Sequence, residues 1–193
     1  MRLYLIRHGE VEGNQEGRCV GWDPLPLTEK GRRQAAALAR RLASVPLTGV
    51  YSSDLVRTLE TAAIVAEPHG LPVVPLTGLR ETNFGEWSGL TYDEMYQREP
   101  EVLERWLQDP ERVAPPGGET LIEMRERVLS ALPRVDGAAV VTHGGPVRAI
   151  MSHWLGTSFW SIGVPPASLT AIEWDGERML RLICLGDTAH LEA

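Results

Sequence analysis

The chain has 193 residues, of which 43% are hydrophobic and 23% charged, a composition that is ordinary for one globular domain and excludes a disordered chain. Its formal net charge of −7, without any Lys/Arg tract, argues against binding nucleic acid through its phosphates. The apolar runs are too short for a signal peptide or for the roughly 18 residues of a membrane span. We therefore expect a cytoplasmic protein without nucleic-acid or membrane partners.

The N-terminal half alternates short apolar runs with segments of helical periodicity, a pattern typical of an α/β domain with a mostly parallel sheet. Leu3–Ile6 is apolar at consecutive positions, as expected of a strand that is covered on both faces. Thr28 is the expected N-cap of a helix that reaches about Leu42. The next expected elements are a strand at 50–52, a helix over about 54–67, and a short strand at 73–74.

The middle of the chain is predicted to form a small helical cap at about residues 84–118. Thr91-x-x-Glu94 and Thr120-x-x-Glu123 are capping-box patterns, which place helix starts just after each threonine. A further helix is expected over 100–109, before a turn-rich break at 115–118. The whole chain, 1–193, is expected to be one domain, a three-layer α/β/α sandwich that carries this cap.

The C-terminal third is predicted to complete the sheet. Ala138–Thr142 has the character of a buried strand, and the helix after it is expected to begin with Pro146 at its first position. Two further strands, at 169–174 and 179–185, are expected to pair as an antiparallel hairpin through Asp175-Gly176.

Charged and polar residues gather at the expected carboxyl edge of this sheet, where α/β proteins bind their ligands. They are Arg7, His8 and Gly9 after the first strand, Arg57 in the opening turns of the second helix, Glu81 after the third strand, and His143 and Gly144 after the fourth. Each histidine is followed by a glycine, which allows a ligand to approach the backbone closely. We therefore expect two arginines, two histidines and one carboxylate to converge on one site.

Arg57 conflicts with its expected local electrostatics. A cation near a helix N-terminus opposes the helix dipole by roughly 0.3–1 kcal/mol. A bound anion would remove the conflict, because it attracts both the guanidinium and the free N–H groups of the first turn. The alternative is a salt bridge from Arg57 to Asp54 or Glu60 on a solvated face.

This set of side chains suits the hydrolysis of a phosphate monoester. Planar guanidinium groups bind the oxygens of the dianion, and a neutral histidine can attack phosphorus and become phosphorylated. A carboxylic acid can give the departing alkoxide its proton. The scheme needs neither a metal nor a cofactor, and Cys19 and Cys184 lack a metal-ligand spacing. A metallohydrolase built from the same histidines and Glu81 is an alternative.

The motifs, in this order, resemble the histidine phosphatase superfamily (phosphoglycerate mutase-like) over roughly residues 2–155. The matching segments are 5–10 (LIRHGE), 51–62 (YSSDLVRTLETA), 79–89 (LRETNFGEWSG) and 141–145 (VTHGG), with Asn14, Gly21-Trp22, Pro26-Leu27-Thr28, Gly31 and Gln34. The resemblance implies a phosphohistidine mechanism with His8 as nucleophile, Glu81 as proton donor, and Arg7, Arg57 and His143 around the phosphate. The further substrate contacts expected are Gly9, Asn14, Gly21 and Gly144.

Within this family, several positions depart from the mutase pattern. Phe84 stands where mutases carry tyrosine, Gly145 where they carry asparagine, and Val20 where they carry a small hydroxyl residue. Residues 90–118, which correspond to the basic insertion of the mutases, contain no lysine. These departures favour water over phosphoglycerate as the phosphate acceptor. A cofactor-dependent phosphoglycerate mutase and a catalytically silent phosphate-ligand binder are the rival hypotheses.

The sequence indicates a class of candidate substrates and not one compound. Residues 19–23 and 116–120 are similar to the α-ribazole phosphatases of cobalamin assembly, so α-ribazole 5′-phosphate is the first candidate, before other small phosphate esters. The same segments recur in broad-specificity and fructose-2,6-bisphosphate phosphatases. The aromatic residues Trp22, Phe84, Trp87 and Trp106 either line the pocket for a base-like substrate or pack in the core. For the oligomeric state, both a monomer and a homodimer are compatible with the sequence.

Overall fold

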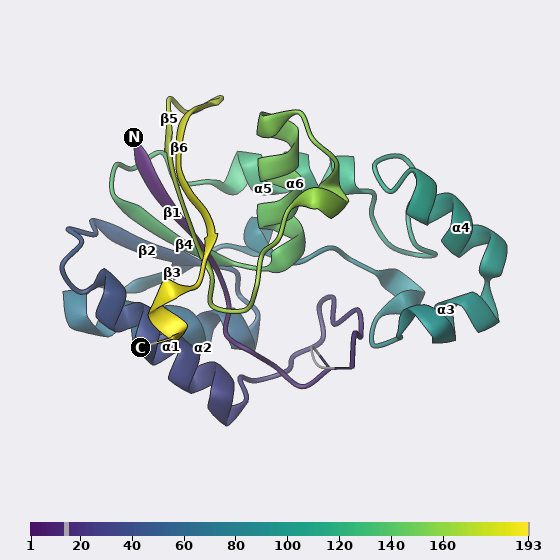
Figure 1. Cartoon of the computed structure of the whole chain (residues 1–193), viewed down its shortest axis with the longest axis horizontal. Coiled ribbons are helices and arrows are strands. Elements are labelled where there is room, and N and C mark those ends of the chain that lie inside the picture. The colour runs from purple at the N-terminus through teal and green to yellow at the C-terminus, as the bar shows by residue number, and fades with distance from the viewer. Residues whose placement is uncertain (14–15, 193) are drawn as a thin grey trace.

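The computed structural model describes residues 1–13 and 16–192. It is built on a six-stranded sheet with the strand order β3-β2-β4-β1-β5-β6 (Figure 1). The strands are β1 (Arg2–Arg7), β2 (Gly49–Ser52), β3 (Val73–Pro75), β4 (Ala138–Thr142), β5 (Leu169–Trp174) and β6 (Met179–Asp187). The first four pair in parallel, whereas β5 is antiparallel to β1 and β6 is antiparallel to β5. The mostly parallel sheet and the C-terminal hairpin are therefore confirmed.

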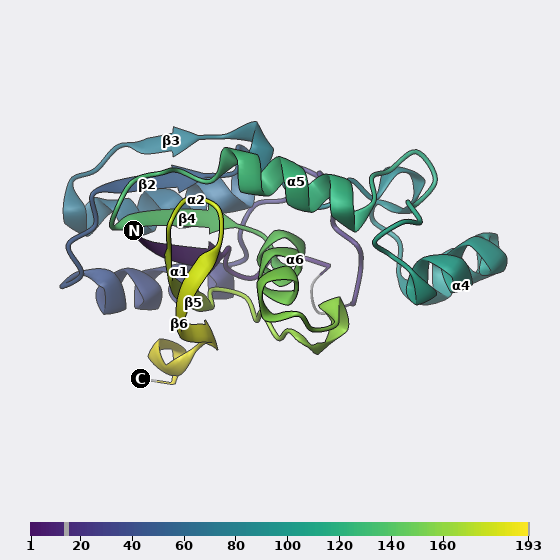
Figure 2. The ribbon, with the colours of Figure 1, turned by 90° about the horizontal axis from the view of Figure 1, so that it is seen from above.

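Helices cover both faces of the sheet and make the predicted three layers (Figure 2). One face carries α1 (Glu29–Leu42) and α2 (Val56–Ala66), and the other carries α5 (Leu121–Ala131) and α6 (Gly144–Leu155). Strand β4 shows why both faces are apolar. Its residues alternate between the two cores, with Val140 in the α5/α6 core and Val141 in the α1/α2 core. None of the helices in residues 1–13 and 16–192 is long and apolar enough to cross a membrane.

The predicted helix starts are governed by local hydrogen bonds. Thr28 caps α1 by accepting from the Gly31 amide at 3.0 Å, and both predicted capping boxes are formed. The start of α6 was predicted wrongly: the helix begins at Gly144, ahead of Pro146. Proline is tolerated throughout the first turn, because the amides there have no partner within the helix. Helix α2 also begins slightly later than expected, at Val56.

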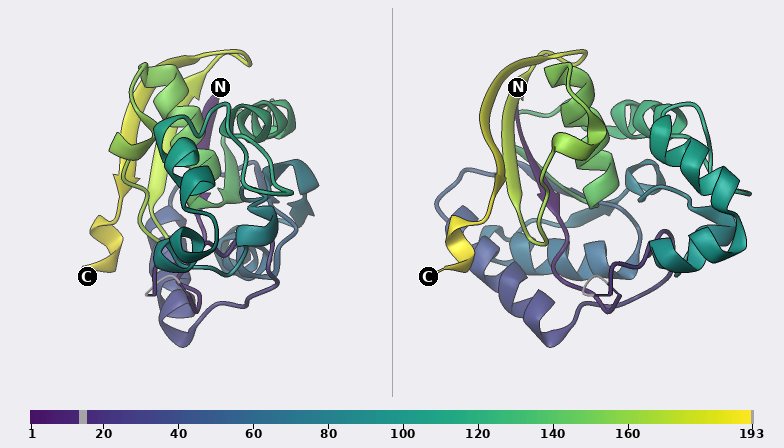
Figure 3. Two further views of the ribbon diagram at one scale, coloured as in Figure 1. Left: turned by 90° about the vertical axis from the view of Figure 1, so that its right-hand side faces the viewer. Right: turned by 45° about the vertical axis from the view of Figure 1, so that its right-hand side comes forward.

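The cap stands beyond the carboxyl ends of the parallel strands, on the opposite side of the molecule from the C-terminus (Figure 3). Its helices are α3 (Tyr92–Arg98) and α4 (Pro100–Gln108), which enclose a small apolar cluster of their own. The backbone of Cys19 fastens the cap to the N-terminal loop through hydrogen bonds with Gly89 (2.7 Å) and Leu90 (2.9 Å). Short 3-10 helices lie at Glu67–His69, Thr77–Leu79, Gly85–Trp87, Phe159–Ser161 and Ala189–Leu191.

Candidate active site

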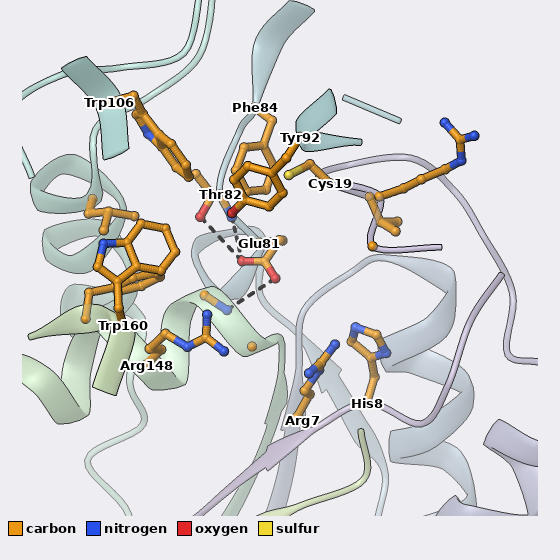
Figure 4. A pocket seen from close by; sticks show the side chains of 18 of the residues that line it. Arg7, His8, Cys19, Glu81, Thr82, Phe84, Tyr92, Trp106, Arg148 and Trp160 are labelled. Carbon is orange, nitrogen blue, oxygen red and sulfur yellow. Dashed lines mark hydrogen bonds between the residues drawn. The ribbon is translucent and has the colours of Figure 1, made fainter. Parts of the chain in front are cut away.

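The predicted residues converge at the carboxyl edge of the sheet, beneath the cap. Arg7, His8, Arg57 and Glu81 line one pocket (Figure 4 labels three of them). His143 is completely buried behind it, with its ring centroid 5.1 Å from that of His8. The two histidines come from the ends of β1 and β4, which are paired strands, so their meeting follows from the sheet order. The predicted convergence is confirmed.

His8 is held as a neutral imidazole with one defined tautomer. Its Nδ1 lies 2.7 Å from the carbonyl oxygen of Gly9, and because a carbonyl only accepts, Nδ1 carries the proton. Its Nε2 accepts from Nε of Arg57 at 3.2 Å. Burial, together with the charges of Arg57 and Arg7, holds the pKa of His8 well below its usual range. Nε2 is therefore unprotonated at neutral pH, and its lone pair is directed at Nε of Arg57.

Arg57 is a buried part of the site, with 1% of its surface exposed. Its two terminal nitrogens donate to the carbonyls of Gly21 (2.6 Å) and Asp23 (2.8 Å). The alternative of a surface salt bridge is wrong, because Asp54 pairs with Arg80 instead. Burial lowers the pKa of Arg57 to about 10, which leaves the guanidinium charged at neutral pH.

Two buried nitrogen atoms of this site have no hydrogen-bond partner among the described residues. They are Nε of Arg7 and Nδ1 of His143. Each residue is held elsewhere: Nη1 of Arg7 donates to the Val164 carbonyl at 2.6 Å, and Nε2 of His143 lies 2.9 Å from Oγ of Ser53. Because buried polar groups in proteins are nearly always paired, both nitrogens are available to donate to the acceptor oxygens of a ligand.

Ser53 is the described hydrogen-bond partner of the His143 ring. Its Oγ accepts from the Leu55 amide at 3.4 Å and lies 2.9 Å from Nε2 of His143, and we assign the hydroxyl proton to this second contact. Nδ1 of His143 then bears the ring hydrogen and is a donor for an anion. The sequence reasoning missed Ser53, although it directly follows β2, at the edge where the site forms.

Replacing Ser53 by alanine is expected to lower kcat/KM for a phosphate ester by about 10- to 100-fold, because a buried nitrogen loses its partner and His143 its fixed tautomer. Nitrogen-15 NMR of the imidazoles should show the His143 proton redistributed between its two nitrogens. Ser52→Ala is the matched control, since Ser52 is equally buried but donates to the backbone carbonyl of Ser53. An unchanged His143 tautomer in Ser53→Ala would refute the assignment.

Glu81 reaches the pocket from the loop after β3 and is held by backbone amides. Its Oε1 accepts from the amide of Thr82 at 2.9 Å and its Oε2 from that of Gly145 at 3.3 Å (Figure 4). Arg127 of α5 fixes the same segment by donating to the Glu81 carbonyl at 3.1 Å. A Cβ atom at Gly145 would lie 2.1 Å from Oε1 of Glu81, so glycine is what allows the carboxylate to occupy this position.

The predicted glycine contacts divide into two groups. Gly21 and Gly144 line the pocket, and Gly144 packs against the guanidinium of Arg7. Gly9 does not line it, contrary to expectation. A Cβ there would lie 2.4 Å from the carbonyl oxygen of Gly31, so glycine is needed for the close approach of α1 and not for a ligand. Asn14 lies outside the described residues.

Cys19 adds a thiol to the pocket wall. Burial, with a smaller contribution from the charge of Glu81, raises the pKa of this thiol to about 12, so it remains protonated at neutral pH. In the part of the chain that the structure describes, no three His, Cys, Asp or Glu side chains lie close enough together to hold a metal ion. Of Cys19 and His8, it is His8 that presents an unprotonated atom at neutral pH.

The model of the histidine phosphatase superfamily (branch 1) matches residues 3–187. The chain belongs to this superfamily. Phosphoserine phosphatase 1 of Hydrogenobacter thermophilus is 36% identical over 200 residues, covering 99% of this chain and 94% of that protein. A probable phosphoglycerate mutase, GpmB of Escherichia fergusonii, is 30% identical over 206 residues, covering 100% of this chain and 96% of that protein.

Solved structures agree with this assignment. The structure of Bacillus stearothermophilus YhfR shares 37% identity with a TM-score of 0.88 and covers 98% of both chains. The α-ribazole phosphatase of Shigella flexneri shares 30% identity with a TM-score of 0.86, also over 98% of both chains. The predicted family and α/β fold are therefore confirmed, and relatives with phosphatase names support a phosphatase.

The aromatic lining of this histidine phosphatase differs from the predicted wall. Phe84 and Trp106 line the pocket as expected. Trp87 is buried in the cap core instead. Trp22 is not among the residues that line the pocket, and its indole N–H donates to the Glu81 carbonyl at 2.7 Å. The remaining lining side chains that sequence reasoning missed are Arg18, Val20, Thr82, Tyr92, Leu121, Arg148, Phe159 and Trp160.

The stability of this histidine phosphatase is expected to fall as the pH drops below about 6.5, the usual pKa of histidine in an unfolded chain. Burial and the nearby arginines lower the pKa values of His8 and His143, so below this pH the unfolded chain binds protons that the folded chain does not. Each histidine therefore costs about 1.4 kcal/mol of unfolding free energy per pH unit, until the pH reaches its native pKa.

Urea titrations in phosphate-free buffer, at pH values above and below 6.5, measure this dependence. Variants His8→Asn and His143→Asn should each lose stability less steeply than the wild type as the pH falls. The buried His190 also has a pKa lowered by burial and acts in the same direction, but it is common to all three proteins. Equal slopes in the three proteins would contradict the prediction.

Proposed function

We propose that this protein is a metal-independent phosphomonoesterase of the cytoplasm that acts through a phosphohistidine at His8. The observation that carries the proposal is the environment of Nε2 of His8. It faces a pocket with two guanidinium groups, those of the half-buried Arg7 and the buried Arg57, and lies beside a second imidazole whose Nδ1 is unpaired among the described residues. A tetrahedral dianion complements this arrangement in both charge and hydrogen-bond acceptors.

In the first step, the phosphate lies between Arg7, Arg57 and the Nδ1–H of His143, with the N-terminal amides of α6 beside it. Nε2 of His8 attacks phosphorus, and the bond between phosphorus and the alcohol oxygen breaks. Glu81, as the acid, transfers its proton to that oxygen. The Gly9 carbonyl stabilises the charge that develops on the imidazole, because it accepts from Nδ1 of His8.

In the second step, water takes the place of the alcohol. Glu81, now a carboxylate, accepts a proton from the water as its oxygen attacks phosphorus, and the bond to His8 breaks. Inorganic phosphate is released, and His8 and Glu81 return to their starting protonation states. The guanidinium groups stabilise the charge on the phosphoryl oxygens in both transition states, since they are already in place.

The first candidate substrate is α-ribazole 5′-phosphate, and other small phosphate esters follow it. The aromatic lining by Phe84, Tyr92, Trp106, Phe159 and Trp160 suits an alcohol with a flat, apolar portion. A structural neighbour named α-ribazole phosphatase supports this candidate, whereas the relative named phosphoserine phosphatase supports a small phosphorylated acid.

Phosphoglycerate mutase is the second candidate function, which the relative named GpmB supports. The surroundings of Glu81 favour the phosphatase. The asparagine that mutases carry at position 145 would force the Glu81 carboxylate away, since even a Cβ there lies 2.1 Å from Oε1. Fructose-2,6-bisphosphatase activity is an alternative within the phosphatases.

A rapid-quench experiment with a 32P-labelled phosphomonoester tests the proposal. Acid-labile, base-stable label on His8 is the expected result. Turnover that stops on addition of a chelator, without trapped label, would favour the metallohydrolase. Tight binding of the ester without turnover would favour a silent phosphate-ligand binder. Conversion of 3-phosphoglycerate to the 2-isomer in the presence of catalytic bisphosphoglycerate would favour the mutase.

A further inference from the structure

Arg148 is a pocket cation that the phosphohistidine scheme does not use. It lies on α6, one turn after Gly144, and lines the same pocket as His8. Two contacts orient its side chain. Its Nε donates to the Ile162 carbonyl at 2.9 Å, and its guanidinium carbon lies 5.2 Å from the centre of the Phe159 ring. The terminal nitrogens are therefore held in one direction, toward the pocket interior (Figure 4).

Arg148 has no ion-pair partner in the part of the chain that the structure describes. None of the described carboxylates forms an ion pair with it, and its terminal nitrogens make no hydrogen bond to those residues. Another arginine of the pocket wall, Arg18, is by contrast paired with Glu16 (2.6 Å) and Glu94 (2.9 Å). The charges of Arg7 and Arg57 match the two charges of a phosphate monoester. Arg148 is one positive charge more than that dianion requires.

The surroundings of Arg148 indicate which part of a substrate would meet it. It lies between Arg7 and Trp160, on the side of the pocket that leads away from His8 (Figure 4). Trp160 packs edge-on against Trp106 of the cap, with the ring centroids 5.6 Å apart. Arg148 is therefore placed along the alcohol portion of an ester and bordered by aromatic rings.

We infer that Arg148 binds a carboxylate on the alcohol portion of the substrate, so that phosphate monoesters of flat, apolar hydroxy acids are preferred over α-ribazole 5′-phosphate, which carries no carboxylate. This inference rests on the proposed function for the orientation of the ester. A carboxylate fits better than a second phosphate, because one guanidinium balances the single charge of a carboxylate but not the two charges of a phosphate monoester.

Calorimetric binding of phosphonates tests the inference without requiring turnover, since a methylene group replaces the ester oxygen. The probes are benzylphosphonate, its 3- and 4-carboxy derivatives, and the neutral 4-carbamoyl derivative. We expect the wild type to bind the better carboxy isomer about 10- to 100-fold more tightly than benzylphosphonate, the range for a charge-assisted hydrogen bond. In Arg148→Gln this preference should disappear, while the Kd for benzylphosphonate changes by less than about threefold.

Arg18→Gln is the matched control, because it removes a pocket arginine that is already paired, and it should keep the preference for the carboxy probe. Arg148→Lys keeps the positive charge and should therefore keep part of the preference for the carboxy probe. It serves as the second variant if Arg148→Gln does not fold. Equal weakening of all probes in Arg148→Gln, or no preference in the wild type, would overturn the inference. Hydrolysis of phenyl phosphate by the wild type is measured separately. Its absence would count against the proposed phosphatase activity, whereas the binding data alone test the role of Arg148.

Discussion

Replacing His8 by alanine is expected to lower kcat for a phosphomonoester by at least ~10⁴-fold while leaving the fold intact. The imidazole is the group that would become phosphorylated, and its Nε2 is unprotonated at neutral pH, where it accepts a hydrogen bond from Arg57. Rapid-quench labelling should find no phosphohistidine in the variant. Phosphate binding should persist, because Arg7, Arg57 and His143 remain.

His153→Ala is the control for this experiment, since His153 is exposed on α6 and outside the pocket, and its kcat should equal that of the wild type. Circular dichroism and a thermal melt establish whether His8→Ala folds. A variant that folds and retains more than a tenth of the wild-type rate would exclude His8 as the nucleophile. Loss of the fold would instead favour a structural role for this buried side chain.

Replacing Glu81 by glutamine is expected to reduce kcat by about 10²- to 10⁴-fold for an alkyl phosphate, because the departing alkoxide no longer receives a proton. The size of the loss should depend on the leaving group. Dinitrophenolate is a stable anion and needs no proton, so the phosphorylation step with dinitrophenyl phosphate should be nearly as fast in Glu81→Gln as in the wild type.

Stopped-flow spectroscopy separates the two steps. With dinitrophenyl phosphate, Glu81→Gln should release a burst of dinitrophenolate equal to the enzyme concentration and then turn over slowly, because water lacks its general base in the second step. Glu86→Gln is the matched control, an exposed glutamate on the same segment that lies outside the pocket. An equal loss for alkyl and dinitrophenyl esters, without a burst, would contradict the acid role of Glu81.

The features that the sequence predicts best are those determined by neighbouring residues. The caps at Thr28, Thr91 and Thr120 depend on side chains and amides three residues apart, and all three form as predicted. The meeting of His8 with His143 was also predictable, since both follow apolar strands and parallel strands end at one edge of a sheet.

The features that depend on distant segments were not predictable in the same way. Whether Arg57 would face Asp54 or the site depends on the loop at 21–23, whose carbonyls hold it. Gly9 has the sequence signature of a ligand contact, yet the space beside it is taken by the backbone of α1. Arg148 and Trp160 both line the pocket because the chain turns back after α6, where the Ile162 carbonyl accepts from Arg148. No local sequence pattern predicts this contact.

The attachment of the cap has a consequence for how substrates exchange. The loop whose Cys19 backbone bonds to Gly89 and Leu90 of the cap also supplies the two carbonyls that hold Arg57, which in turn contacts His8. Lifting the cap would therefore disturb the surroundings of His8. We expect alcohol and phosphate to leave past rotating side chains at the pocket mouth, on the timescale of rotamer flips and not of domain opening.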